Sequence, residues 1–149
     1  MPTIPDETLV AIGRLTTAVT DLEFTLAWIG ADQQGGDSGK VFAEPGEPQR
    51  AARGSVEFAP APYRDAFLQA VSDADGLVKQ SHAAVRALWL SEGDDDTTEL
   101  TLLQRPTRIR RAADPALFND LAMRLMDCSA HLDALINAHL DGLPLPPKG

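Results

Sequence analysis

Histidine and arginine are spaced for joint chemistry in the stretch LVKQSHAAVRALWLSEG. His82 and Arg86 are four residues apart, so they share one face if the stretch is helical. A histidine can move a proton and an arginine can stabilise a developing phosphorane, so the pair could act on a phosphate ester. The alternative is that both residues lie on the rim of a helix bundle, beside the apolar residues Val85 and Leu88.

The segment Leu77–Leu90 and the order of the predicted helices resemble the HEPN family of small helical bundles. Members carry an Arg-x(4–6)-His signature on a later helix, often followed by Leu-Trp, and HAAVRALWL resembles that region. The resemblance implies a ribonuclease or RNA-binding protein whose histidine and arginine contact the RNA backbone at a dimer interface. The order differs here, because His82 precedes Arg86 and residues 90–93 contain no histidine. The resemblance therefore implies a relative that does not cleave RNA.

Four arginines fall within seven positions, at Arg105, Arg108, Arg110 and Arg111. The acidic run EGDDD lies only nine residues earlier, so one interpretation is an internal ion-pair network on a solvated edge. The other is a binding patch for a phosphate-rich or acidic partner. A net charge of −9 disfavours long-range attraction to nucleic acid, so RNA binding would depend on this patch.

Metal binding and nucleophilic catalysis have little support. Asp127 and His131 share a helical face, and His139 lies about two turns further along. However, no Glu-x-x-His or His-Glu-x-x-His motif is present, so we expect no metal and no cofactor. The single cysteine, Cys128, lies on an apolar stripe, where a buried thiol is unreactive and has a raised pKa. The stretch GGDSGK lacks the spacing of a phosphate-binding loop.

The elements that would position these residues are mainly helices. Apolar residues at steps of three or four predict a first helix over Thr8–Ile29, with Gly30 as its stop. Glycine and proline are frequent from Ala31 to Pro62, which predicts a long, partly ordered connection with a short helix from Pro48 to about Phe58. The first stripe consists of Leu9, Ile12, Leu15, Val19, Leu22, Leu26 and Ile29.

Two further long helices are predicted by the same spacing. One runs from Tyr63 to about Leu90, and the other begins at Asp114-Pro115 and ends at Gly142, before a loose tail over residues 143–149. Between them, TELTLLQRPTRIRR allows a small β-hairpin, with strands over about Glu99–Arg105 and Thr107–Arg111. The prediction is a single all-α domain over residues 1–149, a bundle of three long helices plus a short one.

The composition suits a soluble protein without a membrane span, since no apolar run is long enough to cross a bilayer. The first residues show no secretory signal, and a single cysteine allows no internal disulfide. We therefore expect a cytoplasmic localisation. Arginine outnumbers lysine ten to three, and Ala, Gly and Pro are frequent, which hints at a GC-rich bacterial genome.

Three functions are compatible with these observations. The first is a non-enzymatic regulatory or accessory protein that acts through protein–protein contacts, because long apolar stripes in few helices favour a homodimer, with Trp28 and Trp89 at interfaces. The second is a HEPN-like ribonuclease or RNA-binding protein using His82, Arg86 and the Arg105–Arg111 cluster. The third is a small-molecule pocket between helices, lined by Trp28, Phe67 and Trp89.

Overall fold

The computed structural model describes residues 4–34, 36–87, 101–104, 109–112 and 115–147. Helices dominate these residues, so the predicted all-α class is confirmed. For residues 32–34 and 87 and for both short strands, the description covers the backbone alone.

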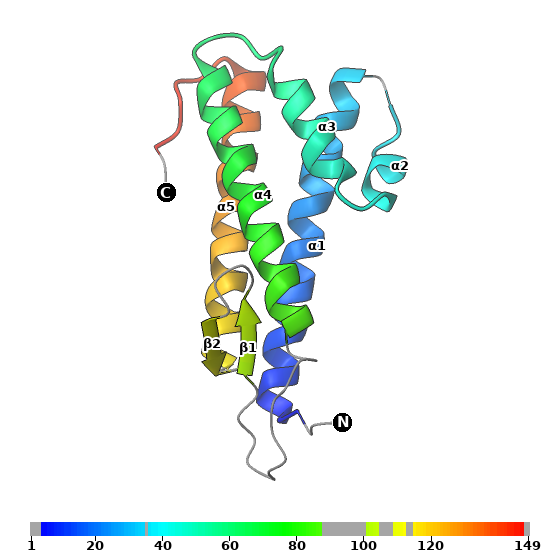
Figure 1. The fold of residues 1–149 in the computed structure, drawn as a ribbon. Helices are drawn as coiled ribbons and strands as arrows, with labels where there is room; N and C mark the ends of the chain where they lie inside the picture. The colour runs from blue at the N-terminus through cyan, green and yellow to red at the C-terminus, as the bar shows by residue number, and fades with distance from the viewer. Residues whose placement is uncertain (1–3, 35, 88–100, 105–108, 113–114, 148–149) are drawn as a thin grey trace.

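Three long helices run side by side, and the middle one in sequence runs opposite to the other two (Figure 1). They are α1 (Asp6–Gln34), α4 (Tyr63–Ala87) and α5 (Pro115–Asp141). Helix α5 packs against both α1 and α4. Within the described residues, no helix is both long and apolar enough to cross a membrane.

Two short helices occupy the connection between α1 and α4. Helix α2 (Ser38–Ala43) begins at Asp37, whose side chain accepts a hydrogen bond of 2.8 Å from the backbone N–H of Gly39. Helix α3 (Glu47–Val56) has a proline in its first turn and packs against the C-terminal half of α1 and against α4. The short helix predicted from Pro48 is therefore present, whereas α2 was not predicted.

Two four-residue strands precede α5. Strand β1 (Thr101–Gln104) pairs antiparallel with β2 (Ile109–Ala112), and β1 also contacts α4. Residues 88–100, 105–108 and 113–114 lie outside the described residues, and with them the predicted end of the second helix and the outer residues of both predicted strands.

The core is formed by the inward stripes of the three long helices and one side of α3. The predicted stripes are largely buried, but Leu9 is 49% exposed, because Thr8 and Ala11 occupy the buried side of α1 at that level. The largest fully buried apolar side chains are Leu15, Leu22, Leu26, Val71, Val78, Phe118, Leu125, Leu132 and Leu135.

Gly30 does not end α1, as the sequence pattern predicted, because the helix continues to Gln34. A Cβ atom at Gly30 would lie 2.5 Å from the Cβ of Ala51 and 2.8 Å from its carbonyl carbon. The Ser55 hydroxyl donates a hydrogen bond of 3.0 Å to the carbonyl oxygen of Gly30. Gly30 is therefore the point at which α3 approaches the backbone of α1, and glycine is required there by packing.

The end of α5 agrees with the predicted glycine stop. Gly142 has a φ of 65°. The N–H of Leu143 donates to the carbonyl oxygen of Ala138, and the N–H of Gly142 donates to the carbonyl oxygen of His139. This is the Schellman arrangement, which satisfies the last carbonyl groups of a helix. The Tyr63 hydroxyl also donates to the Leu143 carbonyl, so the start of the predicted loose tail is attached to α4.

Candidate functional site

The predicted pair of His82 and Arg86 lies on an exposed side of α4. His82 Nε2 is 3.9 Å from Oε1 of Glu23 on α1, and the same carboxylate oxygen accepts a hydrogen bond of 3.4 Å from the Gln49 side chain on α3. Gln49 is 8% exposed, and its Oε1 atom has no hydrogen-bond partner among the described residues. His82 is thus engaged with a carboxylate, as expected for a residue on the rim of a bundle.

A second group of ion pairs continues along the same helices. Asp75 of α4 accepts from Lys79 at 2.8 Å and lies 3.9 Å from Arg53 of α3. The contact between Arg53 and Asp75 links α3 to α4, and opposite charges in this group lie close together. We call this cluster the polar seam; it comprises Glu23, Gln49, Arg53, Asp75, Lys79 and His82.

The other predicted binding residues contribute less to the described structure. Arg105, Arg108 and Trp89 lie outside the described residues, as does the acidic run over residues 92–96. Arg110 and Arg111 belong to β2, where they pair with Leu103 and Leu102 through the backbone. Of the four clustered arginines, the structure thus describes the backbone of two, on a strand whose partner β1 contacts α4.

A polar groove of about 440 Å³ lies between α4 and α5, and Cys128, Asp127 and His131 line it. Burial, with a smaller contribution from the Asp73 carboxylate, raises the pKa of Cys128 to about 11. The thiol is half-buried rather than fully enclosed in the core, but its raised pKa agrees with the sequence interpretation. Among the described residues, no three histidine, cysteine or acidic side chains gather as a metal-ligand set.

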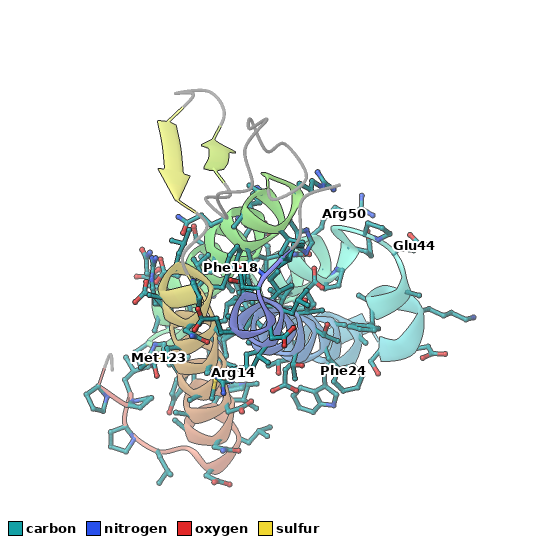
Figure 2. All side chains as sticks on the ribbon, turned by 90° about the horizontal axis from the view of Figure 1, so that it is seen from below. Arg14, Phe24, Glu44, Arg50, Phe118 and Met123 are labelled. Carbon is teal, nitrogen blue, oxygen red and sulfur yellow. The ribbon has the colours of Figure 1, made fainter. Side chains whose placement is uncertain are left out.

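A different kind of surface lies where α1 and α5 run parallel. Figure 2, viewed along the helices, shows Phe118 at the centre and Met123, Arg14 and Phe24 along one side of the molecule. We call this surface the α1–α5 face. Its large apolar residues are between 42% and 66% exposed, and they are Val10, Phe24, Trp28, Met123, Met126 and Leu140.

The two helices contribute to this face as one continuous surface. Asn119, Met126 and Asp133 are seven residues apart on α5, so they lie along one line. Both ends of that line reach α1: Arg14 donates to the Asn119 side chain at 3.4 Å, and Asp133 lines a shallow pocket with Phe24. Met126 therefore lies between two points of contact with α1.

The outward side of α1 carries an uncharged stripe at helical spacing. The hydroxyl of Thr17 donates to the Gly13 carbonyl at 2.9 Å, and that of Thr20 donates to the Thr16 carbonyl at 2.8 Å. Because these hydroxyls are satisfied within α1, the stripe needs no polar partner. Its members are exposed and comprise Val10, Gly13, Thr17, Thr20 and Phe24.

The charges on this face flank the stripe. Arg14 and Asp21 lie beside it on α1 and are both exposed. Partial burial, and then the neighbouring charge of Asp21, raises the pKa of Asp133 above its ordinary value. The face thus has a basic side chain toward one end and two carboxyl groups toward the other.

At the upper end of the face, Trp28 borders a cleft of about 190 Å³ between the long helices. Phe67 lines the same cleft, so the structure brings together two of the three residues of the predicted pocket, while Trp89 lies outside the described residues. Sequence reasoning placed Trp28 at an interface but missed Met123 and Met126. A signal was present, since both methionines lie on the side of their helix opposite to the core stripe.

Comparison with known proteins adds no relative, because no protein-family model, curated protein or solved structure matches this chain.

Proposed function

We propose that this chain is a non-enzymatic helical-bundle protein that acts through protein–protein contacts, as a regulatory or accessory protein of a bacterial cytoplasm. We further propose that its α1–α5 face binds a second copy of the chain. The observation that carries the proposal is the exposed uncharged stripe of α1, flanked by the exposed methionines of α5. Exposed apolar residues gathered on one face are typical of protein interaction sites.

The positions of the stripe residues favour a two-fold partner. Val10 and Phe24 are each seven residues from Thr17, so an antiparallel copy of α1 centred on Thr17 places Val10 opposite the partner's Phe24. In such a two-fold interface, each contact occurs twice. Gly13 and Thr17 have small side chains, which allow the two backbones to approach closely near the centre.

The flanking charges are complementary under the same symmetry. Arg14 lies three residues before Thr17 and Asp21 lies four residues after it, so an antiparallel arrangement brings them together across the interface. A parallel arrangement would instead place each charge opposite its own copy, and like charges in contact are unfavourable. Charge complementarity therefore supports the antiparallel homodimer.

The size of the face predicts a weak dimer. At 1.5 Å per residue, the distance from Val10 to Trp28 is about 27 Å, and two packed helices are about 20 Å across. The projected area is roughly 500 Å² per copy, below the ~800 Å² of a standard stable interface. We expect a dimer whose population depends on concentration in the micromolar range.

Sedimentation equilibrium tests this proposal, and a cysteine at the two-fold centre tests its geometry. In a Cys128→Ser background, Thr17→Cys should form a disulfide-linked dimer under mild oxidation, because only close Cα atoms can be bridged. Ala83→Cys, on an exposed position of α4, is the matched control and should remain unlinked. A monomer at every concentration, or equal cross-linking of the two variants, would contradict the proposal.

Charge reversal distinguishes antiparallel from parallel pairing. Arg14→Asp and Asp21→Arg should each weaken the dimer, and the double variant should restore it, because the opposite charges meet again. Failure of the double variant to recover would exclude the antiparallel arrangement.

RNA binding is the second candidate function, and one observation favours it. Lys79, His82 and Arg86 form a row of exposed basic residues along α4. Two contacts reduce the positive charge of this row, since Asp75 pairs with Lys79 and Glu23 lies close to His82. Binding of labelled structured RNA should then weaken steeply with salt and weaken further in Arg86→Ala. Absence of salt-sensitive binding would remove this candidate.

A further inference from the structure

The cleft beside Trp28 differs chemically from the polar groove between α4 and α5. It lies where the ends of α1, α3 and α5 meet the beginning of α4. Its apolar lining includes aromatic side chains from two helices, Trp28 from α1 and Phe67 from α4, while Val56 and Ala59 close the side toward α3. Within the described part of the chain, no carboxylate or guanidinium group lines it. An occupant must therefore be mainly apolar.

One lining side chain can make a directional polar contact. His139 is held by edge contacts to two rings, with centroid distances of 5.3 Å to Tyr63 and 6.2 Å to Phe67. It is half-buried, and within the described part of the chain no group hydrogen-bonds its imidazole. The Ser55 hydroxyl, by contrast, already donates to the Gly30 carbonyl. His139 is therefore the side chain in this wall that can both donate a hydrogen bond to a ligand and accept one, whereas Ser55 can only accept.

The volume limits the size of the occupant. A cavity of about 150 Å³ lined by apolar side chains holds a benzene molecule. The cleft of about 190 Å³ therefore accommodates one ring or two fused rings, and it is too small for a helix or an acyl chain of membrane-lipid length. Aromatic walls favour an aromatic occupant, because rings pack well edge to face.

We propose that this cleft binds a small aromatic molecule of one or two fused rings bearing a single hydroxyl or N–H group, which hydrogen-bonds to His139. The site goes beyond the proposed dimer and does not depend on it, since only Trp28 and Leu140 of its lining belong to the α1–α5 face. The aromatic ring replaces solvent against Trp28 and Phe67, and the polar group satisfies the imidazole.

Phenol and toluene are matched probes, because they have similar shape and only phenol carries a hydroxyl. Binding is followed through the indole N–H resonance of Trp28 in a Trp89→Phe background, where Trp28 is the only tryptophan. Both probes should shift this resonance saturably, and phenol should bind about fivefold more tightly, the contribution of one net hydrogen bond. In His139→Leu this preference for phenol should disappear. No saturable shift with either probe, or an unchanged preference in His139→Leu, would overturn the proposal.

Filling the cleft provides an independent test. Ala59→Phe should abolish the shift, whereas Phe58→Ala should retain it, because Phe58 is 79% exposed and does not line the cleft. Equal binding by wild type and a folded Ala59→Phe variant would place the probes elsewhere and contradict the proposal. If Ala59→Phe does not fold, the phenol-to-toluene ratio in His139→Leu still decides. Repeating the titration in Thr17→Arg, which should be monomeric, separates failure of the ligand site from failure of the dimer.

Discussion

The two sides of α1 differ in whether their side chains find partners within the chain. On the side toward α3 and α4, the Glu23 carboxylate accepts a hydrogen bond from Gln49 and lies 3.9 Å from His82 Nε2, so it has polar neighbours within the chain. On the side beside α5, an uncharged stripe centred on Thr17 remains exposed. The polar groups of the polar seam therefore find partners within the chain, whereas the α1–α5 face leaves apolar side chains available for a partner.

Two glycines of α1 should show the sharpest contrast between these sides. Gly30→Ala should lower the free energy of unfolding by about 2 kcal/mol, because the new Cβ would overlap Ala51 and overpacking costs about 1–3 kcal/mol. Gly13→Ala on the open face should raise it by about 0.5–1 kcal/mol, because nothing lies within 4 Å of its Cβ position and alanine favours a helix. Urea unfolding measures both.

Gly76→Ala is the control for helix propensity, because its Cβ position is also open. It should stabilise the protein as Gly13→Ala does. If Gly30→Ala were also stabilising, the close approach of α3 to α1 would be wrong.

The polar seam should be weakened most by removing the carboxylate that two neighbours share. Glu23→Ala should destabilise the protein by about 1–2 kcal/mol, because the buried Gln49 amide loses its hydrogen-bond partner. Adding Gln49→Leu should recover most of this loss, since no buried amide then remains unsatisfied. Equilibrium unfolding of the wild type, both single variants and the double variant completes the cycle, and strictly additive effects would show that the two side chains are not coupled.

A charge on the α1–α5 face should affect association without affecting folding. Met126→Lys should change the free energy of unfolding by no more than about 0.5 kcal/mol, since Met126 is exposed. The same variant should weaken the dimer at least about tenfold, because an unpaired lysine must then be desolvated in the interface. Ala83→Lys on α4 should leave both quantities unchanged. Denaturation and sedimentation measurements distinguish these effects, and a loss of stability without a loss of association would reverse the assignment.

Asp133 should show the smallest effect, and the size of that effect depends on pH. Partial burial and the charge of Asp21 raise the pKa of Asp133 in the folded protein, so the folded state binds this proton more tightly than the unfolded state. Its contribution to stability is therefore present in acid, below the ordinary value of 3.8, and is lost as pH rises through the raised pKa. Asp133→Asn should remove this loss and slightly stabilise the protein at neutral pH. Thermal unfolding across a pH series should show the two curves converging in acid; parallel curves would contradict this origin.

Much of the helical architecture could be predicted from local patterns. The residues Leu15, Leu22 and Leu26 recur at the spacing of one helical face and are buried, and Gly142 ends α5 as its position before a proline-rich tail suggested. The candidate surfaces were harder to predict. The periodicity of α5 identifies its inward side, but the exposure of Met126 beside α1 depends on which helix becomes its neighbour.

The sequence by itself determined the three long amphipathic helices and their main core positions, because helix formation and burial follow from spacing within a few turns. Only the tertiary structure decided that Gly30 is a packing contact and not a stop, since this depends on Ala51 of α3 approaching across 21 residues of chain. Helix α2 also depends on tertiary contacts, because SGKVFA is a weak helix former. The ring centroids of Phe42 in α2 and Phe24 in α1 are 5.6 Å apart. The same holds for the α1–α5 face and for the cleft beside Trp28, because each is assembled from residues far apart in sequence, and local periodicity carries no information about which helices pack together.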